Sequence, residues 1–330
     1  MSKVSMQAPR AVVMIRPHHF TPNPVTAADN TFQVRDEKRK PDDLVALAYQ
    51  EATRVADGLA EAGITVHLYE DESAATPDSV FPNNWFSTHS GGHVAIYPMY
   101  SENRRQERRT DIIEMLKAEY RVQDVIDYSG LEKDGVFLEG TGAMVLDHIA
   151  RVAYVVRSNR ANEVALERFC THFNFEPMIF DAVDRSGKAI YHTNVLMCVG
   201  TDFALLGAQL IPDSGRRREI VARLEETGRQ IVELSIEQIE DFAGNAIELE
   251  GTNGRIIAIS GRAHAALQAE QISAIEQSAR LLPFDVSTIE LAGGSVRCML
   301  AGIHLSRRMA QTAQTSFTAK QAAQRNTTDK

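Results

Sequence analysis

Five polar residues recur along the chain at almost equal intervals. The first interval is 55 residues and the next three are 53 residues each. Every one of these residues precedes an apolar run that resembles a β-strand, so the five occupy equivalent places in a repeated unit. They are Asn84, Glu139, His192, Asn245 and Cys298.

This set contains a thiol, an imidazole and a carboxylate, which together can carry out nucleophilic catalysis. Cysteine attacks as the thiolate, so it needs a neighbouring base or cation. His192 can supply either one. The oxygens of Glu139 can accept hydrogen bonds from the N–H groups of a nitrogen-rich substrate. We therefore predict that Cys298, His192 and Glu139 form a catalytic group.

Glycines lie beside both ends of this group. Glu139 is found in VFLEGTGAMVLD (136–147), where two glycines follow it, and Cys298 follows GGSVR. We expect the glycines after Glu139 to leave room for substrate over the carboxylate. Small residues before Cys298 would likewise let substrate approach, and backbone N–H groups there could stabilise a developing charge.

The other cysteines, the other histidines and Asn245 have simpler interpretations. Cys170 and Cys198 are expected to be small core residues, and Asn245 to bond exposed backbone at a strand end. No CxxC or HExxH pattern occurs, and glycines separate His89 from His93, so we expect no metal and no cofactor. Structural or surface roles are expected for His18, His19, His89, His148, His172, His264 and His304.

Strand-like and helix-like segments alternate along the chain. Strand-like runs include 11–15, 64–69 and 93–99. Together with the 53-residue interval, the segments predict five copies of a ββαβ-like unit, an α/β fold whose copies close in a ring and direct their polar residues to a common centre. Residues 1–313 would form this single catalytic domain, and the polar segment 314–330 would be a disordered tail. Apolar residues at helical spacing predict helices at 42–63, 105–119, 161–173, 214–228 and 268–281.

Composition limits the classes of partner. The formal charge of −9 argues against nucleic acid and against an anionic membrane. No apolar run is long enough to span a membrane, and the first residues lack the apolar core of a signal peptide. An odd number of cysteines suits a reducing cytoplasm. We expect a cytoplasmic protein that binds a small molecule, and the sequence does not exclude a homo-oligomer.

Four short motifs, in order, resemble the guanidino-group-modifying superfamily of arginine deiminases, dimethylargininases and amidinotransferases. The motifs are LEGTG (138–142), RSNRAN (157–162), HTN (192–194) and GGSVRCM (293–299). The resemblance covers roughly residues 10–305. It implies the pentein fold, a five-bladed α/β propeller, and covalent thiol chemistry without metal or cofactor. Under this resemblance Cys298 is the nucleophile, His192 the general acid and base, and Glu139 a carboxylate that binds substrate and handles protons.

Two departures from the arginine-directed relatives bear on the substrate. Those relatives carry aspartates where this chain has Asn84 and Asn194, and the aspartates grip a cationic guanidinium. An asparagine is neutral and both donates and accepts hydrogen bonds, which suits a neutral ureido group with its carbonyl acceptor and N–H donors. A carboxylate facing that carbonyl would oppose its lone pairs, and such a mismatch discriminates strongly. The alternative is that one or both asparagines lie away from the substrate.

The N-terminal pattern VVMIRPHHFTPNPVTAADNTFQ (12–33) and FPNNWFSTH (81–89) also resemble the citrulline-utilisation hydrolase branch. This resemblance implies cleavage of citrulline to ornithine, ammonia and carbon dioxide, with Cys298 attacking the ureido carbon and His192 protonating the leaving amine. The alternatives are hydrolysis of arginine or a methylated arginine to citrulline, transfer of the amidino group to an amine acceptor, and a catalytically inactive binding module. Nothing in the sequence favours the binding module, because all three catalytic groups are present.

The amino-acid end of such a substrate needs a partner for its carboxylate. Arg160 in RSNRAN is the best candidate, because its guanidinium can bind a carboxylate through two parallel hydrogen bonds. Arg105 in NRRQERR (103–109) is a weaker one, and a solvated helix start explains that run equally well. Residues 18–33 show no periodicity and are predicted to form a loop that covers the site.

Overall fold

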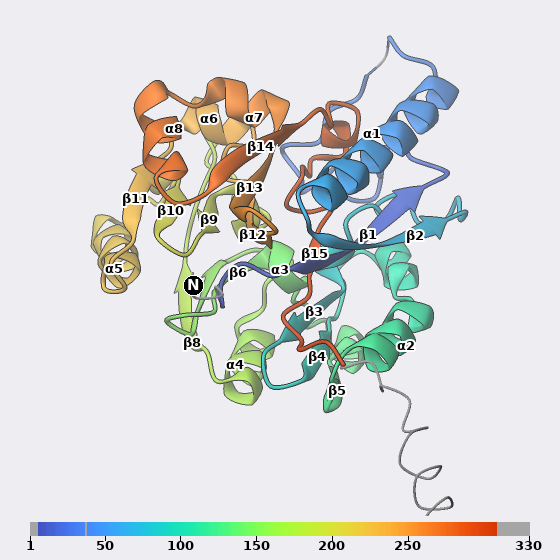
Figure 1. The fold of residues 1–330 in the computed structure, drawn as a ribbon, viewed down its shortest axis with the longest axis horizontal. Coiled ribbons are helices and arrows are strands. Elements are labelled where there is room, and N and C mark those ends of the chain that lie inside the picture. Colours follow the sequence, from blue (N-terminus) through green and yellow to red (C-terminus); the bar gives the residue numbers. More distant parts are fainter. Residues whose placement is uncertain (1–5, 37, 309–330) are drawn as a thin grey trace, which may run out of the picture.

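The computed structural model describes residues 6–36 and 38–308, so the predicted tail at 314–330 lies outside the described residues. Within the described part the chain is a mixed α/β fold with five three-stranded sheets (Figure 1). The long connecting helices lie towards the outside of the molecule, and the short helix α3 (Gly140–Ala143) lies near its middle. No described helix is both long and apolar enough to cross a membrane.

All five sheets share one topology. The first strand is antiparallel to the second, and the second is parallel to the third. One sheet joins the first and the last described strands of the chain, because its first strand, β15, follows Cys298. The sheets are β15–β1–β2 (Ala301–Gly302, Ala11–Pro17, Thr65–Asp71), β3–β4–β5 (Phe86–His89, His93–Ile96, Asp124–Asp127), β6–β7–β8 (Met144–Asp147, Val152–Val156, Glu176–Phe180), β9–β10–β11 (Met197–Val199, Phe203–Leu206, Gln230–Glu233) and β12–β13–β14 (Ile247–Gly251, Gly254–Ser260, Arg280–Phe284).

A helix leads from the second strand of each sheet to the parallel third strand, as such a crossover requires. Each of the five helices predicted from periodicity is present. Local signals set their ends: the Asn162 side chain accepts a hydrogen bond from the Val164 N–H at the start of α4, and Asn174 ends that helix in the left-handed conformation. The crossover helices are α1 (Pro41–Glu61), α2 (Thr110–Glu119), α4 (Glu163–Phe173), α5 (Ser214–Glu225), and α7 (Gly261–Ala266) followed by α8 (Ala269–Glu276), while α6 (Ile236–Glu240) precedes β12.

The five evenly spaced polar residues lie directly before the first strands. Each is in, or next to, a short turn that leads into β3, β6, β9, β12 or β15. Glu139 and His192, for example, are the N-cap residues of α3 and of the 3₁₀ turn Thr193–Val195. The spacing in the sequence is therefore the spacing of equivalent turns, and the repeat that it predicted corresponds to the five sheets.

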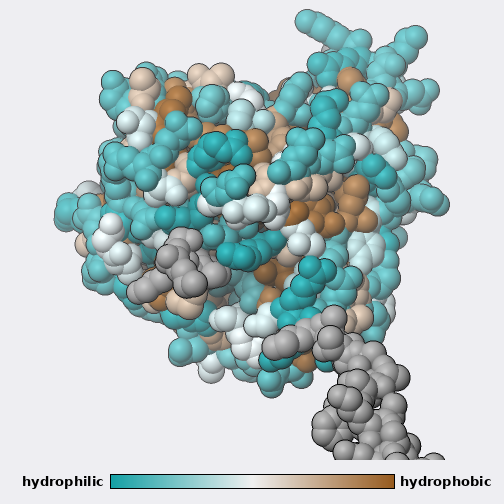
Figure 2. Space-filling model, in the orientation of Figure 1, coloured by the Kyte–Doolittle hydropathy of each residue, from teal (hydrophilic) through white to brown (hydrophobic). Residues whose placement is uncertain are grey.

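Apolar contacts run from each sheet to the next. Buried side chains of β12–β14 pack with β1, those of β1 with β3 and β4, and those of β4 with β6 and β7. A further cluster joins β6–β8, β9–β11 and β12–β14. Hydrophilic side chains cover most of the face drawn in Figure 2, with hydrophobic ones in patches between them. Because no sheet can bury its apolar faces alone, the sheets stabilise one another.

A buried ion pair also links neighbouring sheets. Arg229 donates to both carboxylate oxygens of Asp147 at 2.6 and 2.9 Å, and to the carbonyl of Gly200 at 2.7 Å. Both side chains are fully buried. A buried charge that loses its partner is strongly destabilising, so this pair holds the end of β6 to the loop between β9 and β10.

Arg229→Ala is expected to lower the free energy of unfolding by about 3–5 kcal/mol, because it leaves Asp147 charged and unpaired. Denaturant titration followed by circular dichroism measures this loss. The matched control is Arg223→Ala, which removes a partly exposed pair with Glu176 and should cost about 1 kcal/mol or less. Equal losses in the two variants would contradict the importance of the buried pair.

Candidate active site

Four residues singled out in the sequence line one small cavity: Asn84, Arg160, His192 and Cys298. None of these side chains is more than 2% exposed. The cavity measures about 10 Å³, which is room for about one water molecule. An amino-acid ligand would therefore enter only after a covering segment moves.

Two amide groups are directed at the Cys298 thiol. The Nδ2 atoms of Asn194 and Asn245 each lie 3.2 Å from Cys298 Sγ. Asn245 also donates to the Asn194 carbonyl and accepts from the Arg297 N–H. An amide N–H donates and a thiolate sulfur accepts, so this arrangement suits an anionic nucleophile. The sequence analysis gave Asn245 only a backbone role, although its place in the 53-residue series was a signal for the site.

His192 and Glu139 form a buried hydrogen-bonded pair. His192 Nε2 lies 2.9 Å from Glu139 Oε2, and the other oxygen of Glu139 accepts from the Tyr100 N–H at 3.1 Å. A carboxylate only accepts, so Nε2 carries the proton and Nδ1 of the neutral ring keeps its lone pair. The pair therefore holds the imidazole in one tautomer, with one nitrogen available to take a proton.

Two buried arginines control the charge of this pair. Arg160 Nη1 lies 3.5 Å and Arg104 Nη1 lies 3.6 Å from Glu139 Oε2. Burial raises the pKa of Glu139, but Arg160, His192 and Arg104 together lower it well below its ordinary value. Burial lowers the pKa of His192 to about 4, partly opposed by Glu139. Near neutral pH the site thus holds a carboxylate and an uncharged imidazole.

The sequence analysis expected the two glycines after Glu139 to make room for substrate. The structure shows a different role for them. A Cβ on Gly140 would lie 2.4 Å from the Asn83 carbonyl oxygen, and one on Gly142 would lie 2.8 Å from both Asn84 Nδ2 and His192 Nδ1. Gly140 also has a positive φ of 45°. These glycines therefore let the turns of neighbouring sheets meet closely, which brings His192 onto Glu139.

The loop predicted at residues 18–33 covers the cavity, as expected. It contains no helix or strand, and its Thr26 and Asn30 line the cavity. Asp29 binds Arg160 through two hydrogen bonds of 2.6 and 3.1 Å. The guanidinium predicted to bind a substrate carboxylate therefore holds a carboxylate of the covering loop here.

Arg105 does not reach this cavity. Its guanidinium donates to the Met99 carbonyl and lies 3.5 Å from Glu132, on the partly exposed side of the turn. The preceding residue, Arg104, lines the cavity instead. It binds Glu107 through two hydrogen bonds of 2.9 Å each, and its Nη1 lies 3.4 Å from Asn84 Oδ1.

Asp78 is a further residue that the sequence analysis missed. It lines the same cavity and is 3% exposed. Its Oδ2 accepts from Asn23 at 2.8 Å, while its Oδ1 has no hydrogen-bond partner among the described residues. Only its closeness to FPNN could have indicated it. No cluster of three or more His, Cys, Asp or Glu side chains suitable for a metal occurs in the described part of the chain.

A family model described as N,N dimethylarginine dimethylhydrolase, eukaryotic, matches residues 16–305. No match is found among curated proteins.

Several solved structures share the fold. The N-terminal domain of ArgZ with bound substrate, an arginine dihydrolase from the ornithine-ammonia cycle in cyanobacteria, has a TM-score of 0.68 and 18% identity, covering 89% of this chain and 97% of that one. A variant dimethylarginine dimethylaminohydrolase, as an adduct with S-methyl-L-thiocitrulline, has a TM-score of 0.58 and 15% identity, covering 91% and 100%. Unliganded AgrE has a TM-score of 0.70 and 19% identity; the match covers 91% of this chain but only 40% of AgrE.

The ring of His192 is expected to titrate near pH 4, well below its ordinary value of 6.5, because burial disfavours the imidazolium. NMR of the ring C–H signals between acid and neutral pH measures this directly. Glu139→Gln should lower the pKa of His192 further, because the carboxylate raises it. Titration of His192 at or above 6.5 in the unmodified protein would contradict this description of the site.

Proposed function

Because this chain belongs to the N,N-dimethylarginine dimethylhydrolase family of the guanidino-group-modifying pentein superfamily, we propose that it is a thiol hydrolase that cleaves the ureido group of citrulline. The products would be ornithine, ammonia and carbon dioxide. Family membership supports hydrolysis of a C–N bond. The choice of a ureido substrate over a guanidinium rests on the polar groups around Cys298.

The observation that carries the choice is the group of asparagine amides around the thiol. Asn194 and Asn245 donate to Cys298 Sγ, and the third amide, Asn84, has the Arg104 guanidinium at its Oδ1. Arg104 is a permanent cation that would repel a second guanidinium placed against Asn84. A neutral ureido group meets no such repulsion.

In the described part of the chain, two buried asparagine amides each have one atom without a partner, and one of them is Asn194, whose Nδ2 lies 3.2 Å from Cys298 Sγ. Asn83 Nδ2 is an unused donor and Asn194 Oδ1 is an unused acceptor among the described residues. Unsatisfied buried polar atoms are rare and often mark ligand positions. A ureido group held at the thiol offers several N–H donors, one of which can bond to Asn194 Oδ1.

The chemistry proceeds in two stages. Cys298 gives its proton to neutral His192 and its sulfur attacks the ureido carbon. His192 then returns the proton to the δ-nitrogen as the C–N bond breaks, which releases ornithine and leaves a carbamoyl thioester on Cys298. In the second stage His192 takes a proton from water and the hydroxide attacks the thioester. The C–S bond then breaks as His192 gives that proton to the Cys298 sulfur, which restores the thiol and the neutral imidazole. The released carbamate decomposes to ammonia and carbon dioxide, and Glu139 stabilises the imidazolium in each stage.

The amino-acid end of the substrate would lie between charged groups of the cavity. Arg160 would bind its carboxylate, which requires Asp29 to give way, and the free Oδ1 of Asp78 would accept from its ammonium group. Both Arg160 and Asp78 line the cavity. Since Asp29 belongs to the covering loop, its release from Arg160 would couple substrate binding to loop movement.

The proposal includes the arrangement of the five sheets as blades of a closed pentein propeller. The apolar clusters connect consecutive sheets and return from β12–β14 to β1. The Glu250 N–H also donates to the Pro9 carbonyl across that last junction. In such a ring the turns before the first strands face one centre, which accounts for the meeting of Glu139, His192 and Cys298.

Hydrolysis of arginine or a methylated arginine is the second candidate. It is favoured by the matching family model and by the arginine dihydrolase domain among the similar structures. The substrate separates the two candidates, because the first consumes citrulline whereas the second consumes arginine.

Incubation with citrulline is expected to give ornithine faster than incubation with arginine gives citrulline, as measured by amino-acid analysis. Cys298→Ser should abolish turnover and keep the fold, because a hydroxyl is a far weaker nucleophile than a thiolate. Cys170→Ala, which removes a thiol within α4, is the matched control and should remain active. Conversion of arginine alone would reject the ureido assignment and support the second candidate.

Asn84→Asp is expected to reduce kcat/KM for citrulline by about a hundredfold or more, since the new carboxylate opposes the ureido carbonyl. The loss for arginine should be smaller, because a guanidinium gains an ionic partner. Steady-state kinetics on both substrates measures the difference. Asn253→Asp, an exposed residue in the β12–β13 turn, controls for the added charge, and equal losses on both substrates would count against the role of Asn84.

A further inference from the structure

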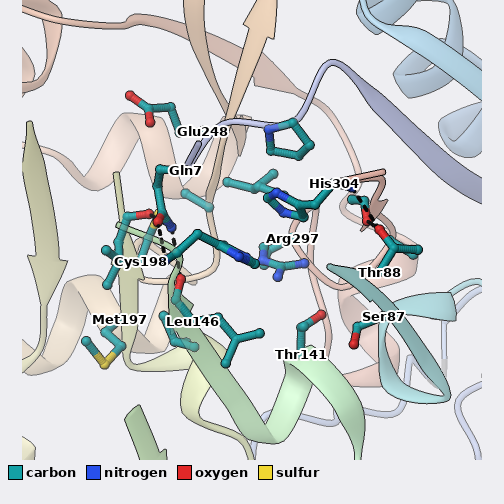
Figure 3. Close-up of a pocket in the computed structure, with 18 of the residues that line it drawn as sticks. Gln7, Ser87, Thr88, Thr141, Leu146, Met197, Cys198, Glu248, Arg297 and His304 are labelled. Carbon is teal, nitrogen blue, oxygen red and sulfur yellow. Dashed lines mark hydrogen bonds between the residues drawn. The ribbon is translucent and has the colours of Figure 1, made fainter. Parts of the chain in front are cut away.

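A second cavity lies on the other side of the chain from the thiol. It measures about 50 Å³ and shares no lining residue with the cavity of Cys298. Arg297, the residue before the nucleophile, lines it together with Gln7, Cys198, His148 and His304. Figure 3 shows the Arg297 side chain extending into the middle of this cavity.

The Arg297 guanidinium has almost no partners. Among the described residues its one side-chain hydrogen bond runs from Nη1 to the Leu300 carbonyl at 3.0 Å, and no carboxylate of that part of the chain lies within 4.0 Å of it. Arg297 is partly exposed, and it lines this cavity. Four of its five N–H donors therefore have no acceptor in the described part of the chain.

The other titratable groups around the cavity do not offset this charge. Burial lowers the pKa of His304 to about 4 and that of His148 well below its ordinary value, so both rings are neutral near pH 7. Glu248 also borders the cavity, but its oxygens accept from Thr201 and lie 3.3 Å from Arg255. In Figure 3 its carboxylate points away from Arg297.

A cation that is largely withdrawn from bulk water is costly unless an anion or a set of acceptors compensates it. We propose that this cavity is a binding site for one small oxyanion, held by the Arg297 guanidinium. A guanidinium presents two parallel N–H groups that match two oxygens of one anion. The volume is about four times the space that one water needs, which suits an anion of four or five heavy atoms.

Bicarbonate and inorganic phosphate both satisfy this chemistry. Bicarbonate is planar and singly charged, and it forms from the carbon dioxide that the proposed reaction releases. Phosphate is tetrahedral and carries more charge. The anion site itself rests on Arg297 and its cavity, and it does not require the proposed function to be correct.

The site is joined to the nucleophile by a short path. The Arg297 N–H donates to Asn245 Oδ1 at 3.1 Å, and the Nδ2 of that same amide lies 3.2 Å from Cys298 Sγ. A bound anion neutralises the guanidinium of the residue before Cys298 and shifts the Arg297 backbone, whose N–H holds Asn245. The bound anion therefore slows the reaction of Cys298 with electrophiles.

Isothermal titration calorimetry of the full chain tests the proposal, with sodium bicarbonate and sodium phosphate titrated separately. A third titration with sodium chloride shows whether any anion that compensates the charge binds equally well. We expect one oxyanion per chain, with affinity reduced by about tenfold or more in Arg297→Gln. Arg280→Gln, which removes an exposed arginine of β14, is the matched control and should bind as the unmodified protein does. Chloride should bind more weakly than either oxyanion, because a monatomic ion cannot offer one acceptor atom to each of the two parallel N–H groups of the guanidinium.

A second measurement follows the rate of carbamidomethylation at Cys298, read by peptide mass spectrometry with and without the anion. The anion should slow labelling in the unmodified protein and leave the rate unchanged in Arg297→Gln. Arg297→Lys keeps the positive charge but lacks the two parallel N–H groups of the guanidinium, so it should bind the anion with intermediate affinity. This variant tests the site if Arg297→Gln does not fold. Absence of saturable binding to the unmodified protein, or equal binding to a folded Arg297→Gln, would overturn the site.

Discussion

A buried carboxylate organises this protein. Glu139 is completely excluded from solvent, and an isolated charge in that position would carry a large desolvation cost. His192, Arg160 and Arg104 surround it, and each comes from a different stretch of the chain. The carboxylate can stay ionised only while these groups are in place. The turns before β6 and β9 and the segments around Arg104 and Arg160 must therefore pack together for the site to exist.

The nucleophile is placed by neutral groups. Two asparagine amides converge on Cys298 Sγ, whereas the charged residues gather around Glu139 and Arg160. This division separates the part of the site that would face a neutral ureido group from the part that would hold an amino acid's charges. The covering loop belongs to the second part, since its Asp29 occupies Arg160.

Because the same sheet is repeated, each unit of about 53 residues brings one polar side chain to the site. Each sheet supplies one turn before its first strand, and five similar sheets supply five turns. The sheet β15–β1–β2 brings the strand after Cys298 beside the first strand of the chain. The nucleophile is thereby fixed by a pairing between residues almost 300 positions apart in the sequence, and close glycines such as Gly142 let the neighbouring turns touch.

Hydrophobic periodicity and the 53-residue spacing were sufficient to predict the crossover helices, the repeated unit and the grouping of Cys298, His192 and Glu139, because those signals are local or periodic. The sequence did not distinguish Arg104 from Arg105, since consecutive residues of a turn point in different directions. It also gave no sign that Asp29 binds Arg160, or that Asn245 bonds the thiol. These contacts join residues 131 and 53 positions apart, and only the packing of one sheet's turn against another decides which side chains meet.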